Sequence, residues 1–118
     1  MLTAAKAKAF LENVPEKYAF YLRDGRKLLN LRQLAAALAD MEYYVWQHHV
    51  GAGRNDFHNW IRDIVLDLEL AQRILTARSS SEAEAIVKQR IAELERAIKP
   101  KKLKKRSARG KERRYAKS

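Results

Sequence analysis

Positive charge is concentrated at the C-terminal end of this chain, and that concentration limits which part of it can fold. The 118 residues include 25 Lys and Arg against 14 Asp and Glu. Residues 99–118 hold 11 of the basic residues and one acid, Glu112, which leaves 14 basic and 13 acidic residues in 1–98. Only Leu103 and Tyr115 offer apolar area there, too little to offset the entropy of ordering twenty residues. We therefore expect a folded domain over 1–98 and a disordered basic tail over 99–118.

The composition of the chain limits where it works. Hydrophobic residues make up 47% of the sequence, enough for a core, and there is no cysteine for a disulfide framework or a Cys-based zinc site. No apolar run approaches the ~20 residues of a membrane helix. Residues 1–9 lack the continuous apolar segment of a signal peptide. These features predict a cytoplasmic protein without a membrane partner.

Hydrophobic periodicity is clearest in the middle of the chain. Six apolar residues there share one face at helical spacing: Phe57, Trp60, Ile61, Ile64, Val65 and Leu68. The stripe continues to Leu75 if one helix spans residues 56–77. If the segment is divided, Asp67 caps a separate helix over residues 68–77. The sequence is compatible with both arrangements.

Further helices are predicted on both sides of this stripe, over residues 3–14, 31–39, 42–50 and 81–98. Pro15 and Pro100 end the first and the last of them. Asn30 is a suitable N-cap, and Ser81 with Glu84 has the spacing of a capping box. The fold class is therefore mainly α, a small domain of four to five helices.

A short β-hairpin or ordered loop is predicted over residues 18–29. An aromatic-rich run comes first, Asp24-Gly25 is a typical turn pair, and a second short apolar run ends at Leu29. Strands this short need support from the helices, because an isolated hairpin is marginal in water.

The basic tail supplies the candidate functional residues. Twelve of them are expected to contact nucleic acid: Lys99, Lys101, Lys102, Lys104, Lys105, Arg106, Arg109, Lys111, Arg113, Arg114, Tyr115 and Lys117. A like-charged run repels itself and attracts polyanions. If about six to ten of these cations meet phosphates, log K falls with log salt at a slope of about −5 to −9. Tyr115 can stack on an unpaired base, which favours RNA over DNA.

Three other roles for the tail compete with nucleic-acid binding. In the first, the tail only keeps the protein soluble. In the second, residues 101–106 act as a nuclear localisation signal. A polybasic membrane anchor normally has a lipidation cysteine or an amphipathic partner helix, and this sequence shows neither. Nucleic acid remains the preferred partner.

Three histidines raise the question of metal binding or catalysis. His48, His49 and His58 lie near Asp56 and Asp63, but their spacing matches no known zinc motif. The sequence also lacks a Gly-rich phosphate loop and a nucleophile motif. We expect no enzyme activity, catalytic residue, metal, cofactor or small-molecule substrate. His48 or His49 is expected to cap a helix or bond a backbone carbonyl, and His58 to lie on a solvated side.

The two tryptophans are candidates either for the core or for base stacking. Trp60 shares its helical spacing with Ile61 and Ile64, so we expect it in the core. Trp46 is expected there as well.

Several short motifs between Phe20 and Ile74 have a recognisable combined pattern. They are Phe20-Tyr21-Leu22-Arg23-Asp24-Gly25, Leu31-Arg32-Gln33-Leu34, His49-Val50, Asn55-Asp56-Phe57, Trp60-Ile61, Asp63 and Leu70-Ala71. This stretch, about half of the chain, resembles a small family of unknown function found in archaea and bacteria. The resemblance implies a compact, mostly helical domain and supplies no activity or catalytic residue. The matched residues look like fold determinants, with His49 tied to the helix cap at Asn55 and Asp56.

The tail itself, outside that stretch, resembles the extensions of small ribosomal proteins. The sequence therefore predicts an RNA-binding component of a ribonucleoprotein, in its most concrete form an archaeal ribosomal protein with other ribosomal proteins as partners. One alternative is a DNA-compacting nucleoid protein. Another is a helical protein–protein adaptor whose tail only adds avidity. An exposed apolar strip on the last helix would favour the adaptor.

Overall fold

The computed structural model describes residues 1–99 and shows the mainly helical domain that the sequence predicts. Its six α-helices are α1 (Ala4–Leu11), α2 (Leu31–Ala39), α3 (Tyr43–His49), α4 (Asp56–Trp60), α5 (Leu68–Ile74) and α6 (Ser80–Ile98). A 3₁₀ turn, η1 (Glu16–Tyr18), follows α1, and a π-helical turn, η2 (Ile61–Val65), continues α4. The predicted tail lies outside the described residues except for Lys99.

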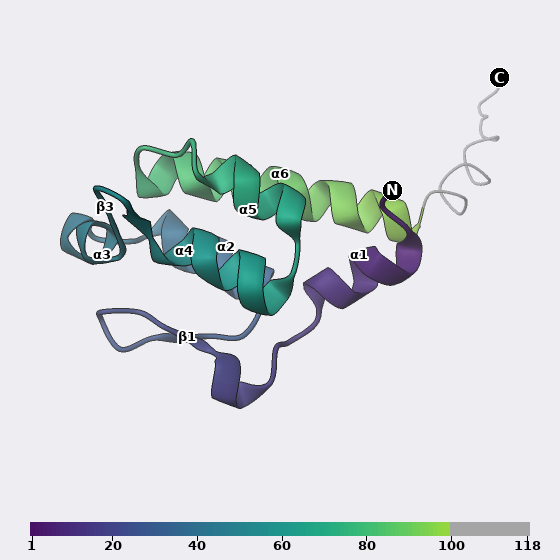
Figure 1. The fold of residues 1–118 in the computed structure, drawn as a ribbon, viewed down its shortest axis with the longest axis horizontal. Coiled ribbons are helices and arrows are strands. Elements are labelled where there is room, and N and C mark those ends of the chain that lie inside the picture. The colour runs from purple at the N-terminus through teal and green to yellow at the C-terminus, as the bar shows by residue number, and fades with distance from the viewer. Residues whose placement is uncertain (100–118) are drawn as a thin grey trace, which may run out of the picture.

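Helix α6 is the longest element, and α1, α2 and α5 pack along it (Figure 1). Its apolar residues recur at helical spacing, and Ala83, Val87, Ile91 and Leu94 are buried. The apolar face of α6 is thus covered by its neighbours, so the exposed strip that an adaptor would present is not found on this helix. No helix within residues 1–99 is long and apolar enough to cross a membrane.

Helix α1 is shorter than the sequence predicts. Thr3 caps it by accepting a hydrogen bond from the Lys6 N–H at 3.1 Å, but the helix ends at Leu11 instead of continuing to Val14. The Val14 N–H donates to the Leu29 carbonyl at 2.8 Å, which holds this segment in an extended connection. Ala7 is the buried residue of α1, whereas Ala5 and Ala9 are exposed.

The start of α6 differs from the predicted capping box. Ser79 is the N-cap, and its Oγ accepts a hydrogen bond from the Glu82 N–H at 3.1 Å. The prediction chose Ser81 and Glu84, but three consecutive serines offer the same spacing in more than one register. Glu84 instead forms an ion pair with Lys88 one turn further along, at 2.8 Å.

The segment that the sequence left open, residues 56–77, is divided at Leu66. Leu66 adopts a left-handed backbone, with φ at 74°, directly after the π-helical turn. Asp67 then caps α5, because its carboxylate accepts a hydrogen bond from the Leu70 N–H at 3.2 Å. The turn resets the helical phase, so Leu68 is 65% exposed although the predicted stripe placed it in the core. This division also raises the helix number to six.

A buried ion pair joins α5 to α6. Arg90 donates two hydrogen bonds to the Asp67 carboxylate, at 2.8 Å from Nε and 3.0 Å from Nη2. The two side chains are only 8% and 1% exposed. Glu93 accepts from Arg90 and from Arg73, both at 3.0 Å, so the pair belongs to a larger network. The two buried charges, Asp67 and Arg90, are therefore each matched by a nearby partner of opposite sign.

The predicted hairpin is present, and a second one was missed. Strands β1 (Phe20–Tyr21) and β2 (Lys27–Leu28) pair antiparallel, with Phe20 opposite Leu28. Gly25 takes the positive φ of +100° that this turn requires. Strands β3 (Val50–Gly51) and β4 (Arg54–Asn55) form the second antiparallel pair, where the sequence indicated only a helix end.

Replacing one partner of the buried pair should weaken the fold strongly. Asp67→Ala leaves Arg90 buried without a counter-charge and removes the cap of α5, so we expect a loss of about 3–5 kcal/mol in the free energy of unfolding. Asp63→Ala is the control, because Asp63 pairs with Arg62 at the surface, and it should change stability far less than Asp67→Ala. Urea denaturation measures both. Equal effects would contradict the importance of burial.

Acid should weaken the same network. Hydrogen bonds from Arg73 and then Arg90 hold the pKa of Glu93 below its ordinary value of 4.5. A lowered carboxyl pKa contributes stability that is complete above the ordinary value and is lost as the pH falls through the lowered one. Glu93→Gln should therefore make unfolding less pH-dependent below pH 4.5, measured by urea midpoints. An equal pH dependence in the wild type and in Glu93→Gln would argue against this role of Glu93.

Candidate nucleic-acid interface

Of the predicted tail contacts, only Lys99 lies in the described residues. It is exposed at the C-terminal end of α6, and its N–H donates to the Glu95 carbonyl at 3.2 Å. The other predicted contacts lie outside the described residues: Lys101, Lys102, Lys104, Lys105, Arg106, Arg109, Lys111, Arg113, Arg114, Tyr115 and Lys117.

The surface at the end of α6 is basic where the tail begins. A shallow hollow of about 510 Å³ lies between α2 and α6, lined by Arg32, Ala92, Glu95, Arg96, Ile98 and Lys99. Arg32 Nη1 is 2.6 Å from Glu95 Oε2, which links the two helices across it. Arg96 and Lys99 are exposed and form no ion pair with any side chain in residues 1–99. The cationic run of the tail therefore starts on the folded surface.

Most other charges of the domain are balanced within it. Eight of the fifteen Lys and Arg side chains in residues 1–99 form ion pairs there. Arg26, for example, lies 3.0 Å from both Asp24 and Asp40. A surface whose charges are mostly paired attracts a polyanion only where cations have no acidic partner.

His49 connects the first hairpin turn to α3 and α4. Its ring is 6% exposed, its Nε2 accepts a hydrogen bond from the Arg23 N–H at 3.0 Å, and its Nδ1 donates to Asp56 Oδ2 at 2.9 Å. These roles fix the neutral tautomer with the proton on Nδ1. The predicted link between His49 and the start of α4 is confirmed at Asp56. The predicted bond to a backbone carbonyl was wrong for His49, because its ring accepts from a backbone N–H instead. Because both nitrogens are engaged, the ring serves as a cross-link and is not placed to take a proton from a substrate.

An aromatic cluster surrounds His49 and contains both tryptophans. Phe57 stacks on Phe20 and on Trp46, with ring centroids 5.0 and 5.7 Å apart. The Trp60 edge meets Phe20, and its Nε1 donates to the Tyr18 carbonyl at 2.8 Å. Trp46 and Trp60 are 5% and 7% exposed, so their predicted place in the core is confirmed and neither offers a face to a base.

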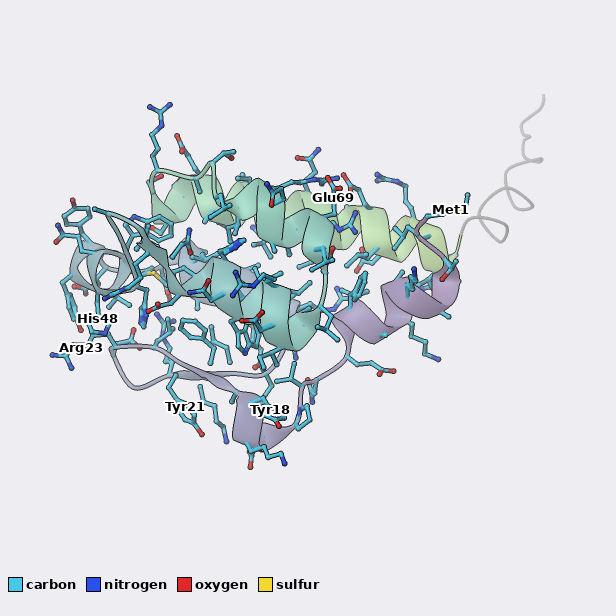
Figure 2. The ribbon with its side chains drawn as sticks, viewed as in Figure 1. Met1, Tyr18, Tyr21, Arg23, His48 and Glu69 are labelled. Atoms are coloured by element: carbon cyan, nitrogen blue, oxygen red, sulfur yellow. The ribbon has the colours of Figure 1, made fainter. Side chains whose placement is uncertain are left out.

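Polar and aromatic side chains gather on the outside of this end of the domain, and we term Arg23, Tyr44, His48 and Arg54 the hairpin-end patch. All four are exposed. Tyr44 and His48 lie one turn apart on α3, so their side chains are neighbours. Arg23 and His48 lie together where α3 meets the hairpin turn (Figure 2). Arg54 comes from β4.

The electrostatics of the hairpin-end patch are positive. Partial desolvation, and then the nearby His49, Arg23 and Arg54, hold the pKa of His48 below its ordinary value of 6.5. Arg23 forms no ion pair with another side chain in the described part of the chain. Arg54 has a loose partner in Asp56, at 3.6 Å, and that carboxylate also binds His49. The patch therefore retains positive charge that the domain does not neutralise.

His58 borders a separate hollow of about 340 Å³ beside the second hairpin. It was expected on a solvated side, but it is half-buried, and its Nδ1 lies 2.7 Å from the Ala71 carbonyl oxygen. It thus ties α4 to α5. Among residues 1–99, no group of three or more His, Cys, Asp and Glu side chains is arranged to hold a metal ion.

Sequence reasoning missed the hairpin-end patch because three separate segments form it. The spacing of Tyr44 and His48 on a predicted helix was the available signal, but it did not say which face is exposed. Two-residue strands such as β3 and β4 leave almost no alternation to detect. The position of Arg23 beside His48 depends on the folded chain.

Comparison with known proteins identifies no relative of this chain. No family model, curated protein or solved structure matches it. The interface is therefore argued from the residues and geometry of the chain itself.

Adjacent histidines provide a matched test of the His49 cross-link. His49→Ala leaves the Arg23 N–H and the Asp56 carboxylate without their buried partner and opens a cavity beside Phe57. We expect a loss of about 2–4 kcal/mol in the free energy of unfolding. His48→Ala, at an exposed ring, should leave the free energy of unfolding nearly unchanged. Chemical denaturation checks both, and similar losses would argue against the cross-link.

Proposed function

We propose that this protein binds nucleic acid, RNA in preference to DNA, as a structural component of a ribonucleoprotein. The segregation of charge carries the proposal: residues 99–118 have 11 basic residues and one acid, beside a domain with nearly equal numbers of each. Phosphate is the partner that such a segment binds most strongly, since each neutralised phosphate releases a condensed counterion. The proposed role is binding, with no catalytic step.

The described domain supports this proposal by its own charge balance. Eight of its basic side chains have acidic partners, and the buried Arg90 is matched by Asp67 and Glu93. The cations Arg96 and Lys99 are exposed at the end of α6, where the tail begins. Phosphate contacts made by the tail would position the domain on RNA with little sequence preference.

The most concrete form of the proposal is a ribosomal protein of archaeal type, acting in the cytoplasm. In that form the domain docks at the surface of the particle, and the tail passes between rRNA helices. Gradient sedimentation of cell extract at moderate salt tests it, with co-migration with ribosomal subunits as the expected result. Recovery with DNA alone would overturn the ribosomal form and favour a nucleoid protein.

Replacing the four tail arginines should weaken RNA binding strongly. Arg106→Ala, Arg109→Ala, Arg113→Ala and Arg114→Ala together should make the salt slope shallower by about 3–4 and lower the affinity at physiological salt at least about tenfold. Fluorescence anisotropy with a structured RNA measures both quantities across a salt series.

A control with the same change in charge tests whether the position of the charge matters. Lys6→Ala, Lys8→Ala, Lys17→Ala and Arg78→Ala together remove four exposed cations from the domain. We expect this variant to lose much less affinity than the tail variant. Equal losses would show that net charge alone governs binding, and an unchanged tail variant would contradict the proposed function.

A further inference from the structure

Helix α3 exposes two large aromatic side chains that the domain does not use. Tyr43 is 72% exposed and Tyr44 is 55% exposed, although tyrosines normally bury much of their ring. Tyr21 on the first hairpin is 62% exposed as well, whereas Phe20, Trp46 and Phe57 are buried. An exposed aromatic face is a ready platform for a flat ligand.

Two cations lie near His48, which is one turn along α3 from Tyr44. Arg23 follows the first hairpin strand, and Arg54 lies on β4. After partial desolvation and the neighbouring His49, both arginines lower the pKa of His48. The side chain of Arg23 forms no ion pair within residues 1–99. The bond to His49 uses the backbone N–H of Arg23 and leaves its guanidinium group available. The hairpin-end patch thus combines an aromatic ring with two guanidinium groups.

The hairpin-end patch lies far from the start of the tail. Figure 1 shows α3 and both hairpins at one end of the domain and the C-terminal end of α6 at the other. A polyanion held by the tail near Lys99 therefore does not automatically reach Tyr44. A separate contact at this end needs chemistry of its own.

We propose that the hairpin-end patch binds unpaired nucleotides of RNA, with a base stacked on Tyr44 and the flanking phosphates held by Arg23 and Arg54. This inference rests on the proposed function and adds the class of nucleic acid that the domain recognises. Stacking on aromatic rings together with cations along the backbone is how proteins take single strands without sequence readout. Bases paired inside a duplex present no free face to Tyr44.

The composition of the hairpin-end patch favours nucleic acid over a protein partner. Protein-binding surfaces have an apolar centre, whereas the hairpin-end patch consists of two arginines, a histidine and a tyrosine and has no aliphatic side chain. The domain's exposed leucines, Leu66, Leu68 and Leu75, belong to the α4–α5 region instead. Excess positive charge complements phosphate directly.

Full-length protein should be titrated against two RNA probes of equal length, one a single strand of about ten pyrimidine nucleotides and the other a blunt duplex. Tyr44→Ala should weaken binding of the single strand about 5- to 100-fold and change duplex binding less than about twofold. Tyr44→Phe keeps the ring and should restore the wild-type affinity. Arg23→Gln with Arg54→Gln should weaken single-strand binding and reduce its salt slope by about 1–2.

Two controls separate this inference from the fold and from the proposed function. Tyr18→Ala removes an exposed tyrosine outside the hairpin-end patch and should leave both affinities unchanged. Wild-type protein that binds neither probe would overturn the proposed function itself. If the wild-type protein binds both probes and Tyr44→Ala binds the single strand as tightly as the wild type does, only the present inference is overturned. That outcome covers the case in which the hairpin-end patch binds a protein instead.

Discussion

The hydrogen bonds of His49 fix the end of the domain on which the candidate interface depends. One ring nitrogen holds the backbone of Arg23 and the other holds Asp56, so three segments meet at one buried side chain. The backbone N–H is a donor that any residue at position 23 would provide, whereas the outward arginine side chain is left free for other contacts. The same bond therefore stabilises the fold and places a cation at the surface. Phe57 and its aromatic neighbours exclude water from this link, which strengthens it.

The helices and most of their caps were predictable because they depend on local chemistry. Asn30 caps α2 as expected, since its side chain accepts from a backbone N–H three residues later. The division at Leu66 was harder to predict, because leucine rarely adopts a left-handed backbone and Gly or Asn would be the normal signal. A tertiary contact accompanies the division at Leu66. Asp67 pairs with Arg90 of α6 at the position where α5 begins. A partner 23 residues away leaves no trace in local periodicity.

The candidate interface was predictable only where composition defines it. Eleven basic residues in twenty predict phosphate binding from composition alone, and for the tail this stays a prediction. The hairpin-end patch depends instead on which side of α3 faces the core. Val45, Trp46 and His49 turn inward, which leaves Tyr44 and His48 outside. All of these residues are apolar or aromatic enough to be buried, so their pattern alone does not choose the face.

The buried and the exposed arginines of this chain differ in their partners for one physical reason, the cost of removing a charge from water. Inside the domain a guanidinium must have a partner, because an isolated buried charge is strongly unfavourable, and Arg90 accordingly has two carboxylates. At the surface an unpartnered guanidinium loses little, since water solvates it, and it stays available to an external phosphate. On the proposed roles, the rigid domain sets the spacing between such cations at its two ends. Contacts at both ends of the domain would then reinforce each other only when the phosphates held at one end and the unpaired nucleotides at the other match that spacing in one RNA. Selectivity would come from the arrangement of the RNA and not from its base sequence.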